Sequence, residues 1–329
     1  MKVVIVGAGM GGMSAAIALR QIGIDTEVYE RVTENRPVGA AISVWPNGVK
    51  CLNYLGLRDQ TARLGGIVDT MSYIDGHTGE TMCRFSLQPL IDQVGQRPYP
   101  IARAELQAML MQAYGPDRIH FGCKMVSVHT GPDAATARFA DGSTVSADVV
   151  IGADGAGSIT RDYVLGAPVS RRYAGYVNFN GLVQTDDAIG PATEWTTYVG
   201  DGKRASVMPV ANGRFYFFFD VVEPEGVAYE NGSAREVLRA HFADWTAGVQ
   251  ALIDKLDPAN TNRVEIFDLD PFHTWVKGRV ALLGDAAHNT TPDIGQGGCS
   301  AMEDAVALQW AFRDHPGDVP AALAAYQNA

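Results

Sequence analysis

The sequence is poor in cysteine, with only Cys51, Cys83, Cys123 and Cys299 spread over 329 residues. No two of them have the C-x-x-C spacing, which excludes the usual zinc-binding pattern and a dithiol redox centre. Scattered cysteines also suit a reducing compartment. We therefore expect a cytoplasmic protein without a metal site.

Long hydrophobic runs and an excess of positive charge are missing as well. Residues 3–19 carry no charge and mimic a secretory signal, but four glycines between positions 7 and 12 would weaken such a helix. The stretch is also shorter than the ~20 apolar residues that a membrane span requires. The net charge of −11 argues against nucleic acid or an anionic membrane as a partner. We expect neither nucleic-acid binding nor membrane association.

The clearest positive signal is a glycine-rich turn near the N-terminus. Residues 2–6 predict a buried strand, residues 14–20 a helix, and residues 26–29 a second strand. Between the first strand and the helix stands Gly7-x-Gly9-x-x-Gly12, and Glu30 follows about 20 residues later. Such a turn lets a pyrophosphate approach the backbone at a helix N-terminus, while the acidic residue accepts a ribose hydroxyl. The pattern predicts dinucleotide binding.

The order of the other predicted elements indicates an α/β fold built from two interleaved domains. Nucleotide-fold elements recur at the start, middle and end of the chain, and alternating runs between 171 and 219 predict an antiparallel sheet. We expect a discontinuous Rossmann-like cofactor domain with an inserted β-rich substrate domain. The predicted cofactor domain comprises residues 1–70, 100–170 and 275–329, and the substrate domain residues 71–99 and 171–274. Further predicted strands are 40–44, 71–74, 81–85, 119–128, 135–139, 148–151, 263–269 and 279–283, and further helices are 46–55, 102–115, 233–242 and 297–312.

Two more glycine–acid motifs follow the first: Asp154-Gly155 after the strand at 148–151, and Gly284-Asp285 after the strand at 279–283. In this order the three motifs resemble those of the single-component (group A) flavoprotein monooxygenases, the para-hydroxybenzoate hydroxylase type. The resemblance implies that the first motif holds the ADP half of bound FAD. It also implies that Asp154 serves FAD and pyridine-nucleotide binding and that Asp285 contacts the ribityl chain. Since only one Gly-x-Gly-x-x-Gly motif exists, NADH is expected as a transient co-substrate.

The resemblance extends to further cofactor contacts. Arg103 matches an arginine that reaches the phosphate or ribityl region of FAD, and Ser43 lies in a matching loop. Residues 292–298 precede the last long helix, so their backbone N–H groups and the helix dipole can face a flavin; the alternative is a glycine-rich helix cap. We interpret His288 as a structural histidine. The predicted cofactor-binding residues are Gly7, Gly9, Gly11, Gly12, Glu30, Arg31, Ser43, Arg103, Met125, Asp154, Asp285, Gly295, Gln296, Gly297, Gly298 and Cys299.

Several stretches narrow the resemblance to the bacterial FAD-dependent urate hydroxylases: residues 40–50, 171–178, 202–204, 213–220 and 290–298. This similarity implies that Arg204 binds the urate anion, that Asn178 and Tyr216 line the pocket, and that Asp293 joins Tyr216 in proton chemistry. The residue types agree, since the arginine fork suits the edge of a flat anion. Taken alone, Arg204 could equally be a surface cation, Tyr216 a core aromatic and Asp293 a helix cap.

The reaction implied is the hydroxylation of urate at C5 to 5-hydroxyisourate, with NADH reducing FAD and O₂ forming a flavin hydroperoxide. Two other functions stay open: hydroxylation of a phenolic acid such as salicylate, and an NAD-dependent dehydrogenase. A disulfide reductase would need a second glycine motif and a cysteine pair, and the flavin-halogenase pattern Trp-x-Trp-x-Ile-Pro is also missing from the sequence.

The C-terminus departs from the resembled family. The chain ends at Ala329, inside a helix predicted to begin near Val319, whereas family members usually continue into further helices. Either the chain is shortened or a C-terminal cover of the fold is missing. A homodimer is therefore kept as a hypothesis only.

Overall fold

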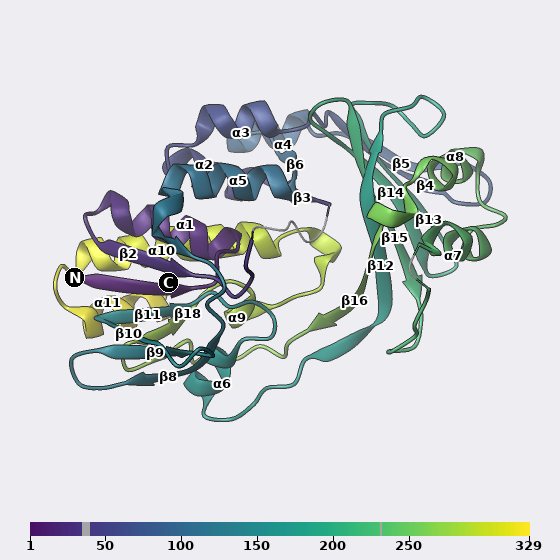
Figure 1. The fold of residues 1–329 in the computed structure, drawn as a ribbon. Helices are drawn as coiled ribbons and strands as arrows, with labels where there is room; N and C mark the ends of the chain where they lie inside the picture. The colour runs from purple at the N-terminus through teal and green to yellow at the C-terminus, as the bar shows by residue number, and fades with distance from the viewer. Residues whose placement is uncertain (35–39, 231) are drawn as a thin grey trace.

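The predicted N-terminal strand–turn–helix–strand unit is present, and its strands lie within a parallel sheet (Figure 1). The computed structural model describes residues 1–34, 40–230 and 232–329. The six-stranded sheet has the order β17-β18-β11-β1-β2-β7, and its strands are parallel except for β17. The strand bounds are β1 Lys2–Val6, β2 Asp25–Tyr29, β7 Ile119–His120, β11 Val149–Gly152, β17 Val276–Lys277 and β18 Val280–Leu282.

Alternate residues of β1 face two different layers, as the strand period of two requires. Val3 and Ile5 pack against helices, whereas Val4 and Val6 pack against a small antiparallel sheet. The small sheet has the order β10-β9-β8, and helices α6 and α9 lie on the same side. The helical layer comprises α1 Met10–Gln21, α2 Pro46–Tyr54, α3 Arg58–Leu64, α5 Arg103–Tyr114, α10 Gly297–Asp314 and α11 Val319–Gln327, and the opposite layer β8 Met125–Thr130, β9 Ala135–Phe139, β10 Thr144–Ala147, α6 Ile159–Leu165 and α9 Asp285–His288.

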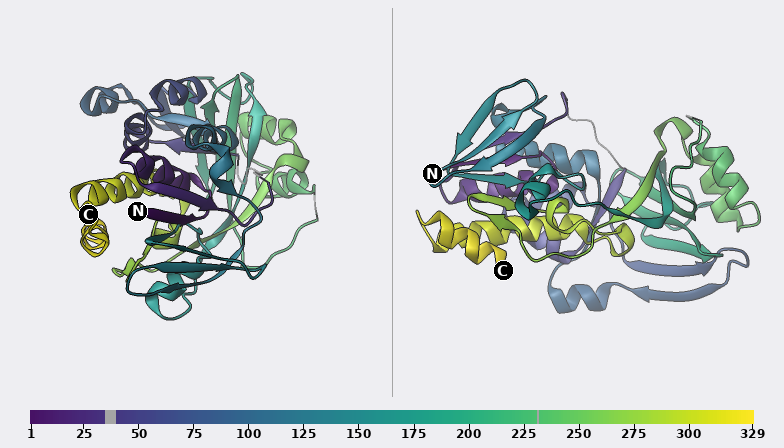
Figure 2. Two further views of the ribbon diagram at one scale, coloured as in Figure 1. Left: turned by 60° about the vertical axis from the view of Figure 1, so that its left-hand side comes forward. Right: turned by 90° about the horizontal axis from the view of Figure 1, so that it is seen from below.

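A second large sheet stands beside this sandwich (Figures 1 and 2). Its order is β16-β12-β15-β14-β13-β4-β5, with antiparallel neighbours except for the parallel pair β13–β4. Phe215, Phe217 and Phe219 of β15 are fully buried against helices α7 and α8 on the outer face. The intervening Tyr216, Phe218 and Asp220 therefore face inward, toward the six-stranded part. The bounds are β4 Thr70–Asp75, β5 Thr81–Ser86, β12 Arg172–Gln184, β13 Glu194–Gly200, β14 Lys203–Val210, β15 Arg214–Val222, β16 Asn262–Asp268, α7 Ala234–His241 and α8 Ala247–Lys255.

Three short elements connect the parts. Strand β3 (Ala41–Val44) pairs with β6 (Tyr99–Ala102), and helix α4 (Gln88–Val94) follows β5. None of the described helices is both long and apolar enough to cross a lipid bilayer.

The predicted fold class is confirmed, with corrections in detail. Helix α1 begins at Met10, inside the glycine motif, rather than near residue 14. The single strand predicted over 119–128 is instead β7 and β8, in two different sheets. Ser233 stands at the N-cap of α7, but its hydroxyl donates to the Glu230 carbonyl oxygen and makes no cap bond. The predicted domain boundaries stay a proposal, which the pairing of β4 with β13 supports.

Candidate functional site

The three glycine–acid motifs meet at the carboxyl ends of β1, β11 and β18, the edge where parallel sheets bind ligands. Gly7 has φ +106°, and a Cβ there would lie 2.1 Å from the Ala153 carbonyl oxygen. Only glycine therefore lets the first motif pack against the second. Gly9 is the N-cap of α1, and no side chain of the described structure caps that helix. Its first amide groups are thus free to bind an anion.

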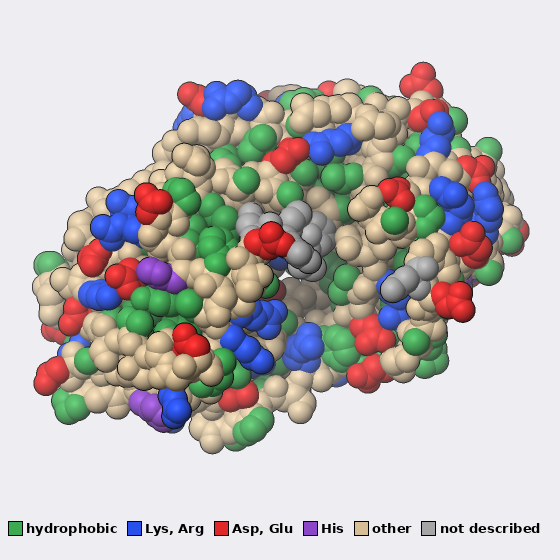
Figure 3. Space-filling view, viewed as in Figure 1, with side chains coloured by type: hydrophobic (Ala, Val, Ile, Leu, Met, Phe, Trp, Pro, Cys, Tyr) green, Lys and Arg blue, Asp and Glu red, His purple; other side chains and the backbone are tan. Residues whose placement is uncertain are grey.

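A cavity of about 450 Å³ lies between the six-stranded and seven-stranded sheets. The molecular surface is hollowed at this junction (Figure 3). The cofactor side and the substrate side of the sequence prediction both contribute to its wall. Predicted residues that line it are Gly9, Gly11, Gly12, Ser43, Arg103, Asp285, Gly295, Gly297 and Gly298 for the cofactor, and Asn178, Arg204, Tyr216 and Asp293 for the substrate.

The residues on the cofactor side fit FAD. Arg103 begins helix α5 and supplies a cation beside the glycine turn, while the exposed carboxylate of Asp285 begins α9. The loop before α10 packs tightly on β3: a Cβ at Gly295 would lie 2.4 Å from Ser43 Oγ, and one at Gly298 would lie 2.3 Å from Ile42 Cδ1. This packing leaves the backbone of the loop facing the cavity.

Two predicted cofactor carboxylates, Glu30 and Asp154, accept hydrogen bonds from the protein in this structure, and their contacts to FAD stay predictions. Glu30 Oε2 accepts from the Ala8 amide at 2.8 Å, so it orders the glycine turn itself. Asp154 Oδ1 accepts from the Ser158 hydroxyl, and its Oδ2 accepts from the Thr160 amide at 3.1 Å. Asp154 thus stabilises the beginning of α6, and a direct contact to FAD stays a prediction.

Four other predicted cofactor residues lie outside the lining of the described cavity. Met125 is 6% exposed in the core under the small sheet, and Arg31 is exposed after β2. Gln296 accepts from the Asn47 side-chain amide at 2.9 Å. Cys299 is buried, which raises the pKa of its thiol to about 11. In this structure Gln296 and Cys299 instead connect the loop before α10, and the start of that helix, to residues at the start of α2.

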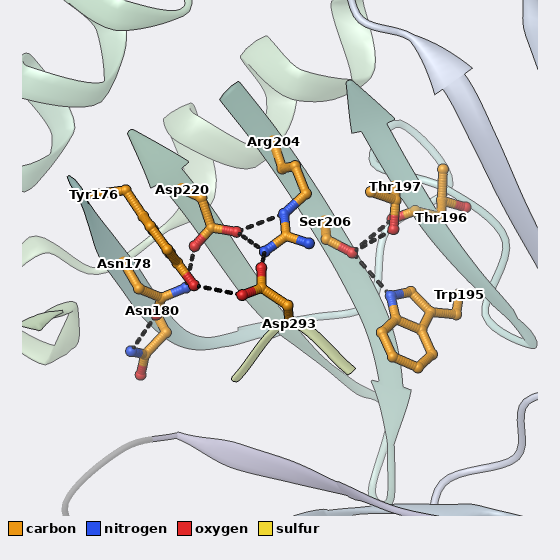
Figure 4. Close-up of polar contacts among 10 residues, drawn as sticks. All are labelled: Tyr176, Asn178, Asn180, Trp195, Thr196, Thr197, Arg204, Ser206, Asp220 and Asp293. Atoms are coloured by element: carbon orange, nitrogen blue, oxygen red, sulfur yellow. Dashed lines mark hydrogen bonds and ion pairs between the residues drawn. The ribbon is translucent and has the colours of Figure 1, made fainter. Parts of the chain in front are cut away.

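Three of the four predicted substrate residues, Asn178, Arg204 and Asp293, belong to a polar cluster on the inner face of the seven-stranded sheet (Figure 4). Arg204 Nε donates to Asp220 Oδ2 at 2.7 Å, and Arg204 Nη2 donates to Asp293 Oδ1 at 2.7 Å. The Tyr176 hydroxyl donates to the other Asp293 oxygen at 3.0 Å. Asn178 Nδ2 donates to Asp220 Oδ1 at 2.7 Å. The cluster joins three strands to the loop that precedes α10.

Sequence reasoning missed Tyr176 and Asp220 as members of this cluster. Each lies on one strand with a predicted site residue, Tyr176 two positions before Asn178 and Asp220 four positions after Tyr216. The strand period of two places such residues on one face, which is the signal that could have found them. The structure adds a hydrogen bond from the Tyr176 hydroxyl to Asp293, and the shared role of Asp293 and Tyr216 in proton chemistry stays a prediction.

The two carboxylates of the cluster have opposite electrostatic environments. Burial raises the pKa of Asp220 despite its Arg204 and Asn178 partners. Burial also acts on Asp293, but hydrogen bonds from Thr291 and Tyr176 and the charge of Arg204 outweigh it, so the pKa of Asp293 is lowered. Asp293 therefore stays ionised at neutral pH.

Aromatic side chains complete the substrate side. Tyr216 lies beside Phe218 with ring centroids 5.7 Å apart, and the Arg204 guanidinium carbon lies 5.7 Å from the Phe218 ring centroid. Burial raises the pKa of the Tyr216 hydroxyl, so this group remains a protonated donor. The Trp195 indole also lines the cavity and donates to the Ser206 hydroxyl at 2.9 Å.

His288 has the structural environment that the sequence suggested. Its Nε2 lies 2.7 Å from Asp304 Oδ2, and the same oxygen accepts from the Gly284 amide at 2.8 Å. Burial disfavours the charged imidazole, but the hydrogen bond and charge of Asp304 outweigh it, so the pKa of His288 is raised. The pair ties the third glycine motif to helix α10.

Comparison with known proteins agrees with this geometry. The sequence model of the FAD-binding domain family matches residues 1–326. An FAD-dependent urate hydroxylase from Mycolicibacterium vanbaalenii is 82% identical over 331 residues, covering 100% of this chain and 84% of the relative.

Crystal structures give the same picture. HpxO from Klebsiella pneumoniae, complexed with FAD and uric acid, has 53% identity and a TM-score of 0.96, over 99% of this chain and 83% of that one. The R204Q variant of HpxO, complexed with FAD, matches with 53% identity and a TM-score of 0.97, over 100% of this chain and 85% of that one. The chain therefore belongs to the FAD-binding domain family and, within its group A flavoprotein monooxygenases, to the FAD-dependent urate hydroxylases.

Proposed function

We propose that this protein hydroxylates urate at C5 to give 5-hydroxyisourate, using bound FAD with NADH and O₂ as co-substrates. One observation carries the proposal: Arg204 and its cluster face the same cavity as the glycine motifs and the loop before α10. The urate hydroxylase relatives and the uric acid complex of HpxO support the choice of substrate.

The cavity offers a flat anion both a positively charged hydrogen-bond donor and apolar ring faces. Arg204 Nη1 has no hydrogen-bond partner among the described residues, so two N–H groups remain for a substrate oxygen or nitrogen. The Phe218 ring lies beside the guanidinium, and the Trp195 ring provides a further apolar face on the cavity wall. Such a combination of a guanidinium fork and aromatic walls suits a planar heterocyclic anion.

Two side chains are placed to handle protons. Asp293 is ionised and can accept a proton, or a hydrogen bond from a substrate N–H. Tyr216 stays protonated and can donate a hydrogen bond to a substrate oxygen. Bound FAD supplies the oxygen-activating redox chemistry, while the protein orients the substrate and excludes water. We further propose a cytoplasmic location and keep the homodimer as a hypothesis.

Substrate-dependent NADH oxidation tests this function. Purified FAD-bound protein is mixed with NADH in air, with urate, with salicylate or without either, and NADH and urate are followed by absorbance. We expect urate to accelerate NADH loss and to be consumed with it. If salicylate stimulates NADH loss and urate does not, the enzyme is a phenolic-acid hydroxylase and our substrate assignment is wrong.

The substitution Arg204→Gln tests the role of the guanidinium. Because glutamine is neutral and lacks the fork, we expect roughly a tenfold or larger rise in urate KM. FAD should stay bound, as it does in the R204Q variant of HpxO. Flavin absorbance after gel filtration checks cofactor retention, and parallel assays of NADH and urate give the KM and the coupling. An unchanged KM with full coupling would remove Arg204 from the proposed site.

A further inference from the structure

Arg204, Asp220 and Asn178 are neighbours across three adjacent strands. The register of β14 and β15 places Arg204 opposite Asp220, and that of β12 and β15 places Asn178 opposite Asp220. Directly opposed side chains of a sheet project from the same face. Here that face is the inner one, which lines the cavity (Figure 4).

Asp220 is the enclosed member of this row. The residue is 5% exposed, whereas the Arg204 side chain is 30% exposed. Asp220 Oδ2 accepts from Arg204 Nε at 2.7 Å and lies 2.6 Å from Nη2. Its Oδ1 accepts from Asn178, whose own side-chain oxygen accepts from Asn180 Nδ2 at 2.8 Å. The carboxylate is therefore fixed on both sides before it meets the guanidinium.

This arrangement decides which edge of Arg204 remains available. Asp220 takes Nε and Asp293 takes Nη2, so Nη1 is the nitrogen without a protein partner among the described residues. Without Asp220, the long arginine side chain would keep only Asp293 as an acidic partner in this cluster and would turn toward it. Another edge of the guanidinium would then face the cavity.

We propose that Asp220 is a positioning residue that holds the Arg204 guanidinium in the orientation required by an anionic substrate. This inference rests on the proposed function and adds a residue to its substrate site. Asp220 acts through Arg204, because both of its oxygens are already occupied by protein donors.

The substitution Asp220→Asn tests the proposal. Asparagine has a single acceptor oxygen, so it can satisfy Arg204 or Asn178 but not both. We expect urate KM to rise about tenfold, because an unsatisfied buried donor in this cluster costs roughly that factor. NADH oxidation should become partly uncoupled from urate loss, whereas FAD content and the maximal rate of NADH oxidation change much less. A purely structural role would lower the melting temperature without this split between KM and kcat.

Glu194→Gln is the matched control. Glu194 is a carboxylate of the same sheet with 7% exposure, and it accepts from Arg84 Nη2 at 2.8 Å and from the Ser72 hydroxyl. It lies outside the lining of the described cavity. We expect this variant to lose stability while its urate KM and coupling equal those of the wild type.

A double-mutant cycle with Arg204→Gln completes the test. If Asp220 acts through Arg204, adding Asp220→Asn to Arg204→Gln changes urate KM and coupling no further. If the single Asp220→Asn variant fails to retain FAD, the comparison of the double variant with Arg204→Gln decides the test by itself. Wild-type KM and coupling in Asp220→Asn, or a tenfold difference between the double variant and Arg204→Gln, would overturn the inference. Failure of the wild type to consume urate would instead overturn the proposed function.

Discussion

At the scale of single residues, the site depends on a cation held between two carboxylates. Arg204, Tyr216, Asn178 and Asp293 could be selected from the sequence because the resemblance to urate hydroxylases assigned them roles. The contacts of these residues could not be predicted from the sequence, since the hydrogen bond between Arg204 and Asp220 depends on the register of β14 and β15. Local sequence does not encode that register strongly, which is why the contact between Arg204 and Asp220 was not predicted.

The substitution Asp293→Asn should reduce the rate of urate hydroxylation by about 10²-fold or more, the usual contribution of a positioned proton acceptor. The ionised carboxylate is removed while the size of the side chain is kept. Because the pKa of Asp293 lies below its ordinary value of 3.8, the wild-type rate should show no ionisation of this group near neutral pH. Rapid-mixing measurements of urate loss across pH check both points, and wild-type turnover in the variant would contradict them.

At the scale of elements, periodicity predicted most strands and helices, and packing decided the rest. Helix α1 begins at Met10 although Gly11 and Gly12 have low helix propensity. The absence of a side chain at Gly11 lets this turn of the helix pack closely on Leu283. A Cβ at Gly11 would lie 2.6 Å from Leu283 Cδ2. Helices α3, α4, α6, α8 and α9 were not predicted. In α4 no residue is buried, so no hydrophobic pattern marks that helix.

The substitution Gly7→Ala should abolish FAD retention. A Cβ would meet the Ala153 carbonyl at 2.1 Å, and the positive φ disfavours alanine as well. Gly23→Ala is the control, since Gly23 also has positive φ, at 79°, but nothing lies within 4 Å of the position that a Cβ would take there. We expect Gly23→Ala to cost about 1 kcal/mol of the free energy of unfolding and to keep FAD. Equal FAD content in both variants would show that the close approach of the motifs is unimportant.

The pair of His288 and Asp304 predicts a pH-dependent stability. Since folding raises the pKa of His288 above its ordinary 6.5, the stabilisation is complete below pH 6.5 and is lost as pH rises through the folded value. His288→Gln should therefore lower the melting temperature most in mildly acidic buffer. Thermal unfolding of both proteins from acidic to alkaline pH measures the difference. A difference that does not shrink as pH rises would argue against a charged His288 in the folded protein.

At the scale of the whole molecule, the cavity exists because distant segments meet. Composition and motif order predicted an α/β cofactor part with an inserted antiparallel sheet, and the fold class is confirmed. The pairing of β4 with β13 joins residues near 70 to residues near 194 in parallel, which no local pattern reveals. Residues of the inner face of the seven-stranded sheet and of the glycine motifs thus line one cavity.

In the proposed reaction, one oxygen atom of O₂ enters urate at this cavity. Its most direct test is mass spectrometry of the product formed from urate and NADH under isotopically labelled O₂, with rapid quenching before the product decays. We expect one labelled oxygen atom in each product molecule, and no label when the isotope is supplied as water. Product labelled from water, or urate recovered unchanged while NADH is oxidised, would contradict it.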